Sequence, residues 1–213
     1  MPVIRKPMDI EKRSMQIIGQ ELLSMGIAPA EENRETVLRT IHASADFDYA
    51  KNLVFTGDAV KKGIEAVQAG KAIITDTNMA LSGVHKKSLE KYHNPCVCYM
   101  ADPEVAEKAK SLGITRAEVS MAKASGTYPD GIYAAGNAPT ALLKLADLIE
   151  GGMRPSLVVG VPVGFVNVLE SKDRILEVCK KYNIPAIVAM GRKGGSSIAA
   201  AILNSIIYQA AGR

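Results

Sequence analysis

The chain has 213 residues, of which 47% are hydrophobic and 23% charged, with a formal net charge of +4. Such a composition is that of an ordinary globular protein, and the length suits one domain spanning residues 1–213. Lysine and arginine are spread along the chain without a basic block, which argues against a nucleic-acid partner.

The sequence also predicts where the protein resides. No stretch approaches the length of a membrane span, and the first residues lack the apolar run of a signal peptide. Three cysteines without the spacing of a disulfide framework favour a reducing compartment. We therefore expect a cytoplasmic protein that makes no membrane contact.

Two helices are predicted at the N-terminal end. Residues 9–25 carry apolar side chains at helical spacing, with Asp9 as the expected N-cap and Gly26 as the stop. A second helix is predicted over residues 30–44. Its buried stripe would consist of Val37, Leu38 and Ile41.

Short apolar runs alternate with helical segments in the rest of the chain, which is typical of a parallel sheet covered on both faces. Asp102-Pro103 and the capping box that begins at Thr115 each mark the start of a helix, and a later helix is expected to start at Ser171 or Asp173. We predict an α/β protein, a three-layer α/β/α arrangement with a mainly parallel sheet of about five strands, preceded by two helices. The expected strands are residues 72–76, 95–100, 131–135, 156–161 and 185–190.

Ligands of open α/β sheets bind beyond the carboxyl ends of the strands, where glycine turns let main-chain N–H groups face an anion. Candidate binding residues at these ends are Gly136, Asn137, Arg192 and Lys193. The loop at residues 191–197 resembles a phosphate cradle but lacks the Gly-Lys-Ser/Thr ending of a nucleotide-binding loop. A carboxylate site fits equally well, and a tight turn with an exposed Arg-Lys pair is the alternative.

The densest group of titratable side chains runs from Arg39 to Tyr49. Arg39 and His42 are three residues apart and share one face of the predicted helix. The cation would favour a neutral imidazole that can exchange a proton near neutral pH, whereas Asp46 and Asp48 oppose this shift. A structural or surface histidine is the alternative, and no role is assigned to Asp46, Asp48 or Tyr49.

Two other groups leave alternatives open. His85, His93, Cys96 and Cys98 place two thiols on one strand face, but their spacing matches no zinc module, and we expect no metal site. Arg116, at the start of its helix, is either a surface cation or an anion clamp.

Several motifs together resemble the precorrin-8X methylmutase family, whose counterpart in anaerobic cobalamin biosynthesis is cobalt-precorrin-8 methylmutase. The resemblance covers nearly the whole chain, from Ser14 to the last helix. The matching motifs are Arg39-x-x-His42-Ala, Asp76-Thr-Asn-Met79 with Gly83-Val84, Thr115-Arg116, Gly136-Asn-Ala-Pro-Thr-Ala-Leu142, Gly160-Val-Pro-Val-Gly-Phe165, Glu170-Ser-Lys-Asp173 and Gly191-Arg-x-Gly-Gly195.

The resemblance implies an isomerase of cobalamin biosynthesis that moves a methyl group from C11 to C12 of a corrin ring by a [1,5]-sigmatropic shift. It places the catalytic, proton-donating histidine at His42 and substrate contacts at Ser14, Arg39 and Arg116. It also implies a homodimer and no cofactor, any cobalt being part of the substrate. A flat polycarboxylate ring needs scattered cations and N–H groups around an apolar floor, which Arg39, Arg116, Lys172, Arg192 and Lys193 would help to supply.

Two other functions remain as alternatives. A corrinoid-binding carrier would hold the same ring without changing it, and single-turnover absorbance would separate the carrier from the enzyme. A nucleotide-binding α/β enzyme would be stabilised by a nucleotide.

Overall fold

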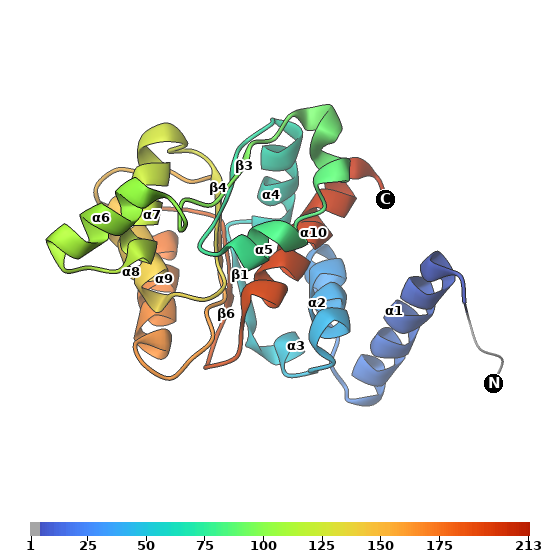
Figure 1. Cartoon of the computed structure of the whole chain (residues 1–213). Helices are drawn as coiled ribbons and strands as arrows, with labels where there is room; N and C mark the ends of the chain where they lie inside the picture. The colour runs from blue at the N-terminus through green and yellow to red at the C-terminus, as the bar shows by residue number, and fades with distance from the viewer. Residues whose placement is uncertain (1–4) are drawn as a thin grey trace.

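The computed structural model describes residues 5–213 and has helices on both faces of one sheet (Figure 1). The sheet contains six strands in the order β1-β6-β5-β4-β2-β3. All neighbouring pairs are parallel except β1 and β6, which are antiparallel. The strands are β1 (Leu53–Thr56), β2 (Ile73–Thr75), β3 (Cys96–Val97), β4 (Ile132–Ala135), β5 (Leu157–Gly160) and β6 (Ala186–Ala189).

The central strands are buried on both faces, as continuous apolar runs predict. Along β4, Ile132 and Ala134 join one core while Tyr133 and Ala135 join the other. The predicted mainly parallel, three-layer architecture is therefore confirmed, although the sheet has one strand more than expected.

The additional strand, β1, lies at one edge and pairs Leu53 with Ala189. It has four residues, only the first of which is buried, and it follows directly after the short helix α3 (Tyr49–Asn52). Such a short edge strand offers no alternating pattern that a sequence-based interpretation can detect.

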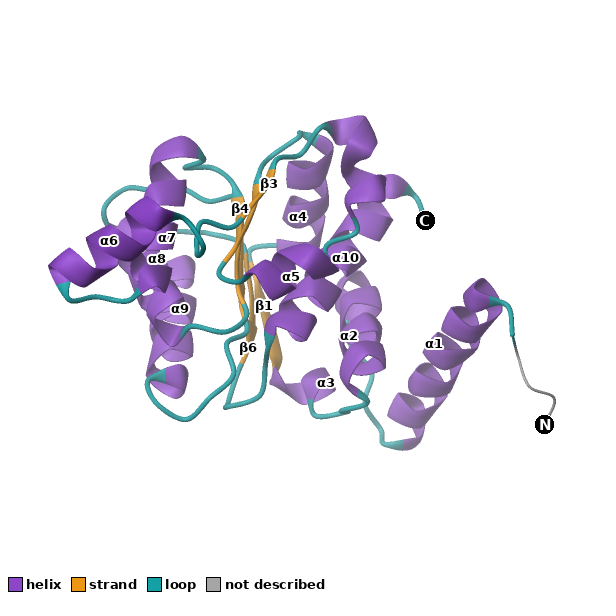
Figure 2. Cartoon of the chain, in the orientation of Figure 1, coloured by secondary structure: helices purple, strands orange, loops and turns teal. Residues whose placement is uncertain are grey.

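The first of the two faces is covered by helices from both ends of the chain (Figure 2). α10 is buried along most of its length, and most of its buried apolar residues belong to the same core as those of α2 and α4. This layer contains α2 (Glu31–Ser44), α4 (Ala59–Gln68), α5 (Asn78–Gly83), the 3-10 helix over Lys86–Tyr92 and α10 (Ser196–Ala211).

The opposite face is covered by α7 (Arg116–Thr127), α8 (Pro139–Glu150) and α9 (Val168–Lys181), with α6 (Pro103–Leu112) packed outside α7 (Figure 2). The predicted caps of two of these helices are present: Asp102 accepts from the N–H of Glu104, and Thr115 and Glu118 form a full capping box. Helix α9 begins at Val168, earlier than either predicted start, and Asn167 precedes it as an N-cap residue in a left-handed conformation.

Helix α1 (Pro7–Ser24) lies outside α2, at the periphery of the molecule (Figure 1). It begins two residues before the predicted start, with Lys6 as N-cap and Pro7 in the first position, so the prediction that Asp9 caps it is wrong. Asp9 lies instead in the first turn, where its charge complements the helix dipole. The predicted buried stripe of α2, Val37, Leu38 and Ile41, is confirmed.

Candidate functional site

Asp76, at the carboxyl end of β2, organises the neighbouring strand end. Its buried carboxylate accepts hydrogen bonds from the main-chain N–H groups of Gly136 at 2.8 Å, Asn137 at 2.8 Å and Ala138 at 2.7 Å. Burial raises the pKa of the Asp76 carboxyl, and the three N–H donors counteract this by stabilising the charged form. Asp76 therefore fixes the turn that leads from β4 into α8.

The same turn lies against the start of α10. A Cβ atom at Gly136 would lie 2.9 Å from both the Cβ of Ala199 and the Cα of Ser196, so only glycine fits. Ser196 is also tied to the end of β2, since its hydroxyl lies 2.8 Å from that of Thr77. The structure thus brings Gly136 and the exposed Asn137 to the carboxyl edge of the sheet, next to the first turn of α10.

His42 lies near the end of α2 and contacts helix α1. Its Nδ1 atom is 2.7 Å from the hydroxyl oxygen of Ser14. Among residues 5–213 no partner of its Nε2 atom is found. The histidine borders an open cavity of about 310 Å³ whose remaining lining comes mainly from α10, with two residues of α2 and one of α5: Arg39, Ala43, Gly83, Ser197, Ala200, Ala201, Asn204 and Tyr208.

The side chain of Arg39 is only 14% exposed and is surrounded by compensating groups. It forms ion pairs with Glu11 at 2.8 Å and Glu35 at 3.2 Å, and its guanidinium lies 4.7 Å from the centre of the Tyr208 ring. The sequence interpretation treated Arg39 as a cation without carboxylate partners of its own and looked to Asp46 and Asp48 to oppose its effect on His42. That premise is wrong, because two carboxylates share its charge.

Glu11 was missed in the sequence, although its spacing holds a signal. Glu11 and Ser14 are three residues apart on α1, the same spacing that separates Arg39 from His42 on α2. Two contacts therefore join the helices: Arg39 donates to Glu11, and Ser14 lies against His42. The hydrogen bond from Arg39 is the main reason that the pKa of Glu11 lies below its usual value.

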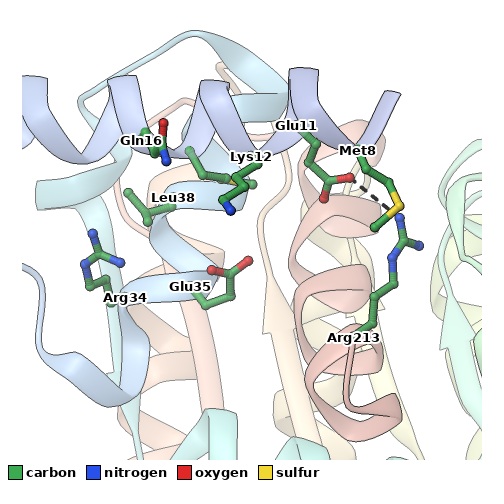
Figure 3. A pocket seen from close by; sticks show the side chains of 9 residues that line it. Met8, Glu11, Lys12, Gln16, Arg34, Glu35, Leu38 and Arg213 are labelled. Carbon is green, nitrogen blue, oxygen red and sulfur yellow. Dashed lines mark ion pairs between the residues drawn. The ribbon is translucent and has the colours of Figure 1, made fainter. Parts of the chain in front are cut away.

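A second cavity, of about 400 Å³, lies between α1, α2 and the C-terminal Arg213 (Figure 3). Glu11 points across it toward Arg213, at 3.6 Å, and therefore joins the chain end to Arg39. The lining mixes carboxylates with cations: Met8, Glu11, Lys12, Met15, Gln16, Arg34, Glu35, Leu38 and Arg213. The mixed charge distinguishes this cavity from a site for a polyanion.

The glycine loop after β6, residues 191–195, is held by two lysines. Lys193 reaches Asp46 at 2.7 Å and Asp48 at 2.6 Å, which raises its own pKa and lowers that of Asp46. Its side chain is thus engaged with the segment after α2. Lys172 is fully buried, and its ammonium group donates hydrogen bonds to the main-chain oxygens of Gly191 and Lys193. The expectation that Lys172 offers a surface cation is therefore wrong.

The two remaining predicted cations are exposed. Arg192 stacks over Phe165, with 5.6 Å between its guanidinium carbon and the ring centre. Arg116 occupies the first position of α7, and the preceding Thr115 hydroxyl lies 2.8 Å from that of Thr140 in the first turn of α8. This contact places the start of α7 beside the helix that follows Gly136 and Asn137.

The histidines and cysteines considered for a metal site are dispersed. His85 bonds Ser88 through Nδ1 at 2.9 Å and lies edge-on to Tyr208. Burial raises the pKa of the thiols of Cys96 and Cys98. Within the described part of the chain, no three histidine, cysteine, aspartate or glutamate residues are grouped as metal ligands would be. None of the described helices is both long enough and apolar enough to span a membrane.

Comparisons with known proteins match this chain along almost its entire length. The family described as precorrin-8X methylmutase matches residues 9–209. The cobalt-precorrin-8 methylmutase of Priestia megaterium is 44% identical over 207 residues, covering 96% of this chain and 89% of the relative. The corresponding protein of Salmonella typhimurium is 40% identical and covers 98% of both chains.

A relative named for precorrin-8X and a solved structure also match. The precorrin-8X methylmutase of a Sinorhizobium species is 34% identical and covers 95% of both chains. The crystal structure of precorrin-8X methylmutase from Thermus thermophilus superposes with a TM-score of 0.86 at 41% identity, covering 96% of each chain. The family that the motifs indicated is thereby confirmed: the chain belongs to the precorrin-8X methylmutase family.

Proposed function

We propose that this protein moves a methyl group from C11 to C12 of a precorrin-8 ring, and that His42 supplies the proton that assists the shift. The observation that carries the proposal is the contact between Nδ1 of His42 and the hydroxyl of Ser14, at the edge of an open cavity. When Ser14 donates to Nδ1, or when the ring is fully protonated, the Nε2 atom carries a proton. That proton is then available to a ligand in the cavity.

A sigmatropic shift is intramolecular, so it needs no external nucleophile or methyl donor. The protein has to bind the ring, place a proton donor beside it and exclude competing geometries. The carboxyl edge of the sheet supplies exposed groups for the carboxylates of the ring, namely Asn137, Arg192 and Arg116. Arg39, which borders the cavity, is proposed to contact the substrate with its charge shared between Glu11 and Glu35.

We further propose that the natural ring contains cobalt. The relatives from Priestia megaterium and Salmonella typhimurium, at 44% and 40% identity, are named for cobalt-precorrin-8, whereas the Sinorhizobium relative named for precorrin-8X is 34% identical. Steady-state kinetics with both rings tests this choice. We expect a higher kcat/KM for the cobalt ring, and a preference for the metal-free ring would contradict it.

We also propose that the protein resides in the cytoplasm and forms a homodimer. The three cysteines are free, which fits a reducing compartment. Helix α1 exposes large apolar side chains that are candidates for burial against a second copy: Ile10, Ile17 and Leu23.

Single-turnover absorbance with excess purified protein tests the enzymatic function against a corrinoid carrier. A methylmutase changes the conjugation of the ring, so the spectrum of the substrate should convert to that of the product acid. A carrier would shift the absorbance bands on binding but release unchanged substrate after denaturation. Recovery of only unchanged substrate would contradict the proposed function.

A further inference from the structure

Lys172 has an unusual environment for a lysine. It is fully buried, and its ammonium group has two acceptors within residues 5–213, the main-chain oxygens of Gly191 at 2.7 Å and Lys193 at 2.9 Å. Neither acceptor carries a charge, and no ion pair of Lys172 occurs in the described part of the chain. An ammonium buried without a counter-ion is costly, so a nearby anion would be stabilised strongly.

The two hydrogen bonds fix the orientation of the loop. The described chain contains no cis peptide bond, and in a trans peptide the N–H group points opposite to the preceding carbonyl. Because the carbonyls of Gly191 and Lys193 point toward the ammonium, the N–H groups of Arg192 and Gly194 point away from it. Neither N–H group has an acceptor among the described residues.

The loop is also held firmly in place. The N–H of Gly195 donates to the main-chain oxygen of Val161 at 2.8 Å, and Lys193 is paired with Asp46 and Asp48. A Cβ atom at Gly194 would lie 2.1 Å from the oxygen of Val161, so the loop packs directly against the strand end. The rigid loop therefore presents, on the side opposite Lys172, two N–H groups that can donate to an anion without rearrangement on binding.

We propose that residues 191–194 form a carboxylate-binding nest for one side chain of the ring, and that Lys172 is the residue that positions and polarises it. The nest rests on the proposed function, which supplies a polycarboxylate ligand at this edge of the sheet. Arg192 adds a guanidinium at the rim, where Phe165, 84% exposed, offers an apolar surface for the ring itself. Lys172 acts through the loop and does not touch the ligand.

The test compares how tightly the protein binds two ligands, the product acid and the same ring with all carboxylates esterified, which carries no negative charge on these groups. In Lys172→Met we expect the acid to bind at least about 10-fold more weakly, because the loop loses the ammonium that orients and polarises its two N–H donors. Affinity for the ester should change less than about twofold, a split that a general loss of structure would not produce. Lys172→Gln keeps hydrogen-bond donors but not the charge, so its affinity for the acid should lie between those of the wild type and Lys172→Met.

Lys180→Met is the matched control, because Lys180 is an exposed lysine of the same helix, and it should leave both affinities unchanged. Equal losses for acid and ester in Lys172→Met, or no loss, would overturn the nest. If the Lys172 variants do not fold, the amide protons of Arg192 and Gly194 in the wild type provide the answer. They should shift downfield on binding the acid but not the ester, and identical shifts with both rings would contradict the proposal.

The same titrations distinguish a failure of the nest from a failure of the proposed function. A wild-type protein that binds the acid and the ester with equal affinity refutes the nest alone. A wild-type protein that binds neither ring refutes the proposed function together with the nest.

Discussion

The pairing of Ser14 with His42 joins two helices that the sequence separates by 28 positions. The sequence identified His42 from its place beside Arg39 and Ser14 only through a resemblance, and it did not indicate that they touch. Helical spacing places side chains on a face of their own helix, whereas the contact depends on how α1 crosses α2. For the same reason, Glu11 was not recognised as the partner of Arg39.

Replacing Ser14 by alanine tests the role of this contact. Ser14→Ala removes the group that orients the imidazole, so we expect kcat to fall about 10-fold with little change in KM, because the effect lies on proton transfer. Ser24→Ala, at the other end of the same helix, should leave kcat unchanged. An increase in KM alone would show instead that Ser14 only binds the substrate.

At the level of elements, the apolar runs predicted five of the six strands, all except the edge strand β1. The glycine turns after these strands predicted where the next helices begin. What the sequence could not show was pairing across long separations. The strand β1 depends on Leu53 meeting Ala189 in an antiparallel register, which no local pattern encodes. The role of Lys172 depends on a loop about 20 residues later in the chain, so a lysine in a charged motif was interpreted as a surface cation.

The buried lysine of α9 also predicts how stability depends on pH. Burial lowers the pKa of Lys172 from 10.5 to about 8. Between these values the unfolded chain binds more protons than the folded protein, so stability gains a positive contribution as the pH rises. Relative to Lys172→Met, the wild type should gain up to about 2 kcal/mol of unfolding free energy between pH 7 and pH 10.

Urea denaturation of both proteins at each pH measures this difference, because the titration of all other groups cancels in the comparison. The Lys180→Met variant should run parallel to the wild type across the same range. A difference between wild type and Lys172→Met that stays constant with pH would show that Lys172 keeps its ordinary pKa in the folded protein.

For the whole molecule, the peripheral position of α1 is the feature that remains unexplained by the monomer. The helix contributes Ser14 and Glu11 to the site, yet its surface also exposes large apolar side chains, including Ile17 at 39% and Leu23 at 70%. A second copy that covers this surface would hold α1 against α2 and thereby stabilise the contact with His42.

Charge introduced on this surface should therefore dissociate the proposed dimer. We expect Ile17→Glu combined with Leu23→Glu to give a monomer by light scattering coupled to size-exclusion chromatography, with reduced activity. Leu112→Glu, on the exposed end of α6, is the control and should remain dimeric. A double variant that remains dimeric would place the interface elsewhere.

The central claim is that His42 delivers the proton for the methyl shift, and replacing it by alanine while following a single turnover tests this most directly. His42→Ala should still bind the substrate and the product acid, since the cations and N–H groups of the strand ends remain. Its rate of conversion should fall by at least about 100-fold, the usual contribution of a positioned general acid. A folded His42→Ala protein that converts the ring at the wild-type rate would contradict the account.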